Sequence, residues 1–154
     1  MIRLISFLMA AVCFSSPADA SEWWWVSGAG KSPERVVIFM DKASLVNHNS
    51  NAEAWSLLVY ERARPDKGSS TRLLRRYDCI ARTSTVLSIL SRRDDGSSVY
   101  SGNVPLTMQT VEHVIPDSTE EEAFNFACDP GHPGHYKLNG ETPEAIARTI
   151  FGEP

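Results

Sequence analysis

The chain has 154 residues, of which 42% are hydrophobic and 22% are charged, and its formal net charge is −4 at pH 7. This composition is typical of a small globular protein with one domain. The mild acidic excess argues against a dedicated nucleic-acid binder, so no nucleic acid is expected among its partners.

The first segment, residues 1–20, has the pattern of a secretory signal peptide. Arg3 supplies a positive charge, and residues 4–14 form an apolar run that is shorter than the ~20 residues needed to span a bilayer. The letters A-D-A at 18–20 match a cleavage site, so we predict cleavage after Ala20 and a mature chain without a transmembrane segment. The predicted location is the periplasm, the outer envelope or the medium. An uncleaved helix and a lipidated Cys13 are the alternatives.

Three adjacent tryptophans open the mature chain at Trp23, Trp24 and Trp25. They begin a short aromatic and β-branched run that predicts a strand. Because side chains alternate along a strand, Trp23 and Trp25 are expected on one face and Trp24 on the other. The run therefore needs cover on both faces, or it leaves an aromatic patch for a partner. We retain all three as candidate binding residues beside the core-packing interpretation.

Further strand signatures follow in an order that predicts an antiparallel meander of about six strands. The six predicted strands are 23–26, 35–41, 54–61, 71–80, 83–91 and a segment that begins at 98. Turns are predicted at 64–68 and 94–96, and the N-H-N-S-N letters at 47–51 predict a loop.

The pattern changes to helix after residue 117. Ser118 and Glu121 fit a capping box, and an apolar stripe then predicts a short helix that ends at Cys128. A second helix is predicted from Thr142 to Phe151, with Pro143 in its first turn. The segment between the two helices is predicted to be a loop.

Two cysteines remain after the predicted cleavage, Cys79 and Cys128. In an exported chain their simplest interpretation is one disulfide, which by chain entropy would contribute about 4 kcal/mol. Two separate buried thiols are the alternative. A zinc site at these residues is not expected, because neither belongs to a C-x-x-C pair. The predicted fold class is α+β, a small antiparallel sheet with a C-terminal helix pinned to it by the disulfide.

The order of these features resembles the bacterial surface-adhesin protein E family. The resemblance rests on the tryptophan-containing first strand at 22–26, the strand that ends at Asp41, the aromatic strand at 54–60, and Y-D-C at 77–79. It ends with I-P-D-S at 115–118, which leads into the helix with Cys128. The resemblance implies an antiparallel sheet whose C-terminal helix is tied to its concave face. It also implies an outer-membrane-associated adhesin that binds host matrix and serum proteins. The predicted division is a domain at 21–129 and an extension at 130–154.

Positive charge concentrates on the predicted fourth strand, at Arg72, Arg75 and Arg76. These residues could attract an anionic partner, or they could form a solvated sheet face. They complete the set of candidate binding residues.

His132 and His135 form H-x-x-H in a Gly/Pro-rich segment, with Asp129 nearby. Such a cluster could chelate a transition metal, and the alternative is a flexible polar loop. We predict the loop, and neither a metal nor a cofactor. No G-x-S-x-G nucleophile motif occurs, so no catalytic residue is assigned.

The sequence thus predicts an exported, non-enzymatic envelope protein with an adhesin-like binding role. Its partner would be a protein or another envelope macromolecule, and it could form a homodimer through a sheet edge. A periplasmic inhibitor or ligand-binding module is the main alternative, and a hydrolase is a weaker one.

Overall fold

The computed structural model describes residues 21–129 and 131–152, so the predicted signal peptide and its cleavage site lie outside the described residues. The strands are β1 (Trp23–Ala29), β2 (Val36–Asp41), β3 (Val46–His48), β4 (Asn51–Arg64), β5 (Gly68–Asp78), β6 (Thr83–Arg92), β7 (Ser98–Asn103), β8 (Val111–His113) and β9 (Tyr136–Lys137). The α-helices are α1 (Thr119–Cys128) and α2 (Pro143–Phe151), and short 3-10 turns occupy Lys42–Ser44 and Leu106–Met108.

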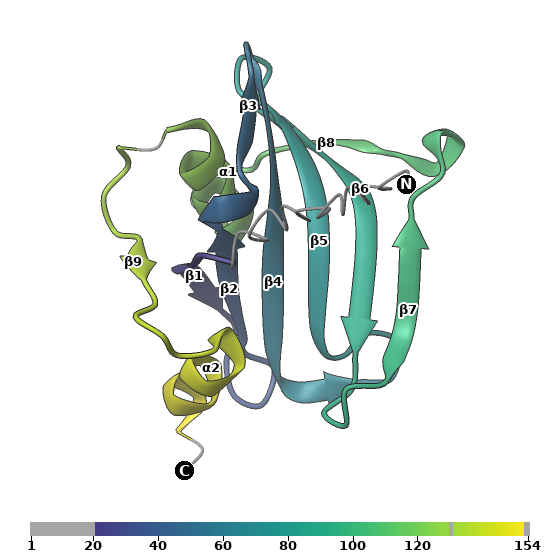
Figure 1. Ribbon diagram of the computed structural model, residues 1–154, viewed down its shortest axis with the longest axis vertical. Coiled ribbons are helices and arrows are strands. Elements are labelled where there is room, and N and C mark those ends of the chain that lie inside the picture. The colour runs from purple at the N-terminus through teal and green to yellow at the C-terminus, as the bar shows by residue number, and fades with distance from the viewer. Residues whose placement is uncertain (1–20, 130, 153–154) are drawn as a thin grey trace, which may run out of the picture.

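All strands join one antiparallel sheet in the order β7-β6-β5-β4-β2-β1-β9, with β3 beside β4 and β8 beside β6 (Figure 1). The six predicted strands correspond to β1, β2 and β4 to β7. They are neighbours in chain order, which confirms the predicted meander. The prediction of about six strands was wrong, because the sheet contains nine strands within the described residues.

The three missed strands are only two or three residues long, which is too short for an alternating pattern to appear. β3 forms a hairpin with the start of β4, so the loop predicted at 47–51 is largely paired backbone. β9 pairs with Trp24 and Trp25 of β1, so the loop predicted between the helices contains a short strand. Both pairings depend on the partner strand and not on the local sequence.

Apolar residues of the sheet are buried on both faces, because a helix covers each one. On one face α1 packs over a cluster that includes Ile38, Met40 and Tyr77. On the other face α2 packs over Val37 and Phe39. Burying a side chain of this size contributes about 1.5–3 kcal/mol. Because α1 and α2 cover the two faces of β2, the strand is apolar at successive positions and does not alternate with polar residues.

Helix α1 begins as its capping box predicts, because the Ser118 side chain accepts a hydrogen bond from the backbone N–H of Glu121. The helix ends at Cys128, which forms the predicted disulfide with Cys79 across a Cα–Cα distance of 5.6 Å. The alternative of two separate thiols was wrong. β5 ends at Asp78, two residues before the predicted limit, because the Asp78 carboxylate accepts hydrogen bonds from the backbone N–H groups of Ile80 and Ala81 and turns the chain.

Helix α2 also begins and ends where its sequence predicts. Thr142 caps its first turn, and Gly152 adopts a left-handed conformation after its last residue. Ala147 and Phe151 are its buried contacts with the sheet. Within residues 21–129 and 131–152, no helix is both long enough and apolar enough to span a bilayer.

Candidate binding surface and histidine cluster

The three tryptophans of β1 divide between the two faces of the sheet as predicted. Trp24 packs against the α1 cluster, where its ring centroid lies 6.1 Å from that of Phe126. Trp23 and Trp25 lie on the α2 face. Trp25 stacks on Tyr136 of β9 at 5.4 Å, with 22° between the ring planes. All three side chains therefore contribute to packing, and their role in binding stays a prediction.

The arginines of β5 alternate in the same way, and the structure separates them. Arg75 lies on the α1 face, where its guanidinium donates to Glu120 at 2.9 Å and to Ser84 at 3.2 Å. Arg76 pairs with Glu53 on β4 at 2.8 Å. Arg72 lies over the ring of Trp23, with 5.4 Å between its guanidinium carbon and the ring centroid. Of the predicted binding residues, Arg72 and Trp23 are thus in direct contact.

A hollow of about 310 Å³ surrounds this contact on the α2 face. We call it the Trp–Arg groove, and it is lined by Ser21, Trp23, Asp41, Trp55, Arg72 and Leu90. The sheet register explains the grouping: Trp23 stands opposite Asp41 across β1 and β2, and Arg72 stands opposite Leu90 across β5 and β6. No helix among the described residues covers the β6–β7 half of the sheet, since both helices lie toward β1, β2 and β4 (Figure 1).

Asp41 is a lining residue of the Trp–Arg groove that hydrogen bonds hold in position. Its carboxylate accepts hydrogen bonds from the backbone N–H of Glu22 at 2.8 Å and of Ala43 at 3.2 Å. The side chain is buried, and these bonds tie the start of β1 to the end of β2. The groove therefore combines the rings of Trp23 and Trp55 with the Arg72 guanidinium on paired strands. This combination suits recognition of another molecule.

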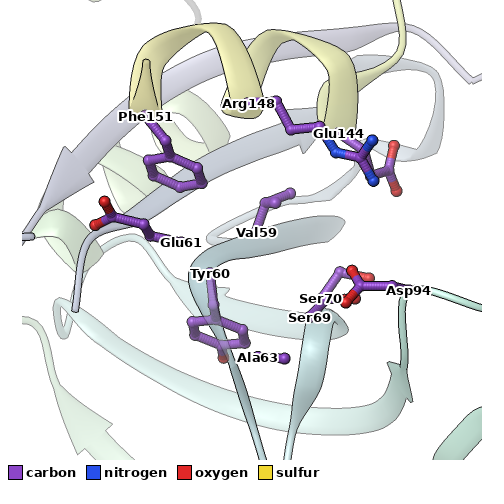
Figure 2. A pocket seen from close by; sticks show the side chains of 10 residues that line it. All are labelled: Val59, Tyr60, Glu61, Ala63, Ser69, Ser70, Asp94, Glu144, Arg148 and Phe151. Carbon is purple, nitrogen blue, oxygen red and sulfur yellow. The ribbon is translucent and has the colours of Figure 1, made fainter. Parts of the chain in front are cut away.

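A second hollow of about 270 Å³ lies between α2 and the ends of β4 and β5. Figure 2 shows Phe151 projecting from α2 toward Val59, with Ser69 and Ser70 on the opposite side. Glu61 at its edge accepts hydrogen bonds from the Arg35 guanidinium at 2.7 and 2.9 Å. These bonds lower the pKa of Glu61 to about 2.

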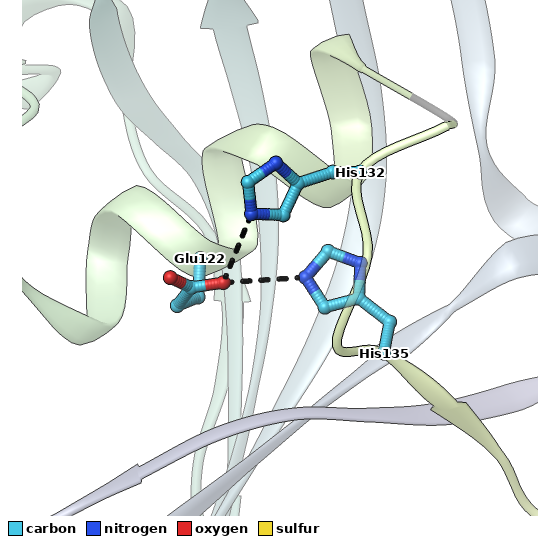
Figure 3. Close-up of side chains that lie close together, drawn as sticks. All are labelled: Glu122, His132 and His135. Atoms are coloured by element: carbon cyan, nitrogen blue, oxygen red, sulfur yellow. Dashed lines mark hydrogen bonds and ion pairs between the residues drawn. The ribbon is translucent and has the colours of Figure 1, made fainter.

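The predicted histidine pair lies beside α1. His132 and His135 direct their Nε2 atoms toward the same Glu122 oxygen, at 3.8 and 3.4 Å respectively (Figure 3). The His135 side chain is only 6% exposed, and this burial lowers its pKa. Asp129, which the sequence placed near the pair, instead accepts backbone hydrogen bonds from Gly131 and His132 and so shapes the turn.

Residue spacing alone did not identify several members of these sites. Strand pairing brings three further residues into the Trp–Arg groove: Asp41, Trp55 and Leu90. Each lies within a predicted strand, at a position whose side chain points to the groove face. No site role was predicted for Glu122 from the sequence. The available signal was that the H-x-x-H pair, His132 and His135, follows the predicted helix end at Cys128 by only four and seven residues.

Burial also affects the acidic start of α1. Glu120 is largely removed from water beside Arg75, and this burial raises its pKa although the guanidinium opposes the change. Glu121 pairs with Arg82, whose guanidinium also lies over the Phe124 ring. The acidic first turn therefore attaches the helix to the sheet.

Together these features define a compact α+β module, stabilised by a disulfide, with an aromatic and arginine-bearing groove on one sheet face. The family model for surface-adhesin protein E matches residues 23–129. The chain belongs to this family, which confirms the resemblance predicted from the sequence. Family membership suggests a cell-surface or extracellular location and binding to host or envelope macromolecules. A search of curated proteins finds no significant match.

Proposed function

We propose that this chain is an exported, non-enzymatic envelope protein that binds a partner protein through the Trp–Arg groove. One observation carries the proposal: the groove places a guanidinium and two tryptophans together on the α2 face of the sheet, in a hollow that no residue of α1 or α2 lines. Trp and Arg are the residue types that contribute most strongly to protein–protein binding.

Arg72 is the residue that favours a protein with an acidic surface as the partner. Within the described part of the chain, Arg72 has no carboxylate at ion-pairing distance, whereas Arg75 and Arg76 each have one. A guanidinium held over an aromatic ring is preorganised and can donate two parallel hydrogen bonds to one carboxylate. The partner expected from this chemistry presents an Asp or Glu beside an apolar side chain.

Export is supported by the signal-peptide pattern at 1–20 and by the disulfide. Disulfides persist in oxidising compartments, which include the periplasm and the cell surface. We therefore infer that the mature chain begins at Ser21 in the envelope. A non-enzymatic role is supported by the adhesin family.

The experiment compares two arginine variants against a panel of purified extracellular-matrix, serum and envelope proteins on a biosensor. Arg72→Ala removes the guanidinium from the groove, and Arg92→Ala removes an exposed arginine from the neighbouring strand β6. For a partner bound by the parent, we expect Arg72→Ala to weaken binding at least tenfold and Arg92→Ala to leave it unchanged. Equal affinities of the parent and Arg72→Ala would refute the groove as the binding surface.

Export is tested separately by the intact mass of the chain recovered from its host. A mass that begins at Ser21, with thiols that react with a capping reagent only after reduction, is the expected result. A retained signal peptide, or two thiols that react without reductant, would contradict export to an oxidising compartment.

A further inference from the structure

We propose that Glu122, His132 and His135 form a binding site for a divalent transition-metal ion such as Zn²⁺. The site lies on the α1 side of the molecule, away from the Trp–Arg groove, and it is independent of the proposed binding function. It joins the helix that carries the disulfide to the segment that leads into β9.

The separations between the three side chains fit a metal site. Their ligand atoms all lie within 4.8 Å of one another, and the Glu122 oxygen lies 3.4 Å from the His135 Nε2 and 3.8 Å from the His132 Nε2. Tetrahedral zinc with bonds of about 2.1 Å separates its ligand atoms by about 3.4 Å. The two Glu122 separations lie within 0.4 Å of this value (3.8 − 3.4), and a pair at the 4.8 Å limit must close by 1.4 Å (4.8 − 3.4). Side-chain rotations of this size would place all three atoms around one ion.

The orientation of the rings also favours an ion. Both imidazoles direct Nε2 toward the same carboxylate oxygen, as Figure 3 shows, and their ring centroids are 5.4 Å apart. With neutral imidazoles protonated at Nδ1, two nitrogen lone pairs would face a carboxylate lone pair. In that tautomer a metal ion would accept all three lone pairs, whereas in the Nε2–H tautomer His135 would instead donate a hydrogen bond to Glu122.

The surroundings hold the ligands in place and leave one position open. The site borders a hollow of about 100 Å³ that is lined by Trp24, Lys42 and Phe126 together with the two histidines. His135 packs on the Phe126 ring at 5.4 Å between centroids, which fixes its orientation. With three ligands from the described residues, a water molecule would complete a tetrahedron.

The ligand set selects the class of metal. Two imidazoles and one carboxylate suit Zn²⁺, Ni²⁺, Co²⁺ or Cu²⁺, whereas Ca²⁺ and Mg²⁺ require oxygen ligands. Lys42 lies over the Phe126 ring at 5.3 Å and adds a positive charge near the site. We therefore expect weaker binding than at a closed four-ligand zinc site.

The test is a calorimetric titration of the tag-free, oxidised chain with ZnCl₂, and with CaCl₂ and MgCl₂ for comparison. One equivalent of Zn²⁺ and no Ca²⁺ or Mg²⁺ should bind. His132→Gln and Glu122→Gln should each weaken Zn²⁺ binding at least tenfold. His48→Gln removes an exposed histidine on β3 and should leave the affinity unchanged.

A thermal melt of each variant without metal verifies that its fold is intact, and His132 suits this design because its side chain is 32% exposed. Addition of Zn²⁺ should raise the melting temperature of the parent and of His48→Gln, but not that of His132→Gln. The absence of saturable one-to-one binding would overturn the proposal. So would unchanged affinity in His132→Gln or Glu122→Gln, or equal losses in His132→Gln and His48→Gln.

Discussion

Helices α1 and α2 cover opposite faces of the same sheet, but different interactions attach them. α1 is held by the Cys79–Cys128 disulfide and by ion pairs from its first turn to Arg75 and Arg82. α2 has no cysteine and packs through Ala147 and Phe151 on the apolar side chains of β2 and β4. One helix is thus fixed at both ends by defined partners, and the other is held mainly by burial.

Polar contacts at the end of α2 also help to orient the helix on the sheet. The Arg35 guanidinium donates to the carbonyl groups of Ile150 and Phe151 and pairs with Glu61. It therefore satisfies carbonyls that the helix end leaves without partners and ties them to β4. The comparison shows two ways to place a short helix on a sheet: covalent closure, and a buried aromatic side chain with a bridging arginine.

The largest effect is expected from Cys128→Ser. The substitution opens a loop with a sequence separation of 49 residues and should lower the free energy of unfolding by about 4 kcal/mol. Urea unfolding measures this change. Hydrogen exchange should show that amides of α1 lose protection while those of α2 retain it. Reduction of the parent serves as the control and should reproduce the loss; equal stability of mutant and parent would contradict the comparison.

A smaller loss is expected from Phe151→Ala. The Phe151 side chain is 8% exposed and fills the contact between α2 and the sheet, so its removal should cost about 3 kcal/mol. Ile150→Ala is the matched control, because its neighbouring side chain is 43% exposed. Both free energies of unfolding are measured in urea. A control variant as destabilised as Phe151→Ala would show that α2 is not held by this buried ring.

Local signals made most of the fold predictable from the sequence. Ser118 and Thr142 mark helix starts because a capping bond forms within one turn of the residue that makes it. The alternation of the three tryptophans was also predictable, since the geometry of one strand determines it. The disulfide was predictable because only Cys79 and Cys128 remain after the predicted cleavage.

The missed features share a dependence on distant partners. β9 is two residues long, and it forms a strand only because its backbone pairs with β1 at the edge of the sheet. The Trp–Arg groove required the register between β1 and β2 and between β5 and β6. Glu122 meets His135 only because the chain reverses after α1. Such features depend on how elements dock, which residue spacing does not encode.

The smallest effect is expected in the pH dependence of stability, and it depends on Arg35. The folded-state pKa of Glu61 is about 2, below its ordinary value of 4.5, chiefly because of the Arg35 hydrogen bonds. A carboxyl with a depressed folded-state pKa contributes stability that is fully present above the unfolded-state pKa and is lost as pH falls through the folded-state value. The parent should therefore lose this contribution between about pH 4.5 and pH 2.

Arg35→Gln should be less stable than the parent at pH 7, and the difference should shrink as pH falls over that interval. Ser32→Ala is the matched control, because Ser32 donates one weaker hydrogen bond to the same carboxylate at 2.8 Å and should produce a smaller change of the same sign. Thermal melts from pH 2 to pH 7 measure both. A stability difference between parent and Arg35→Gln that is constant with pH would show that Arg35 acts on α2 through the helix carbonyls alone and not through Glu61.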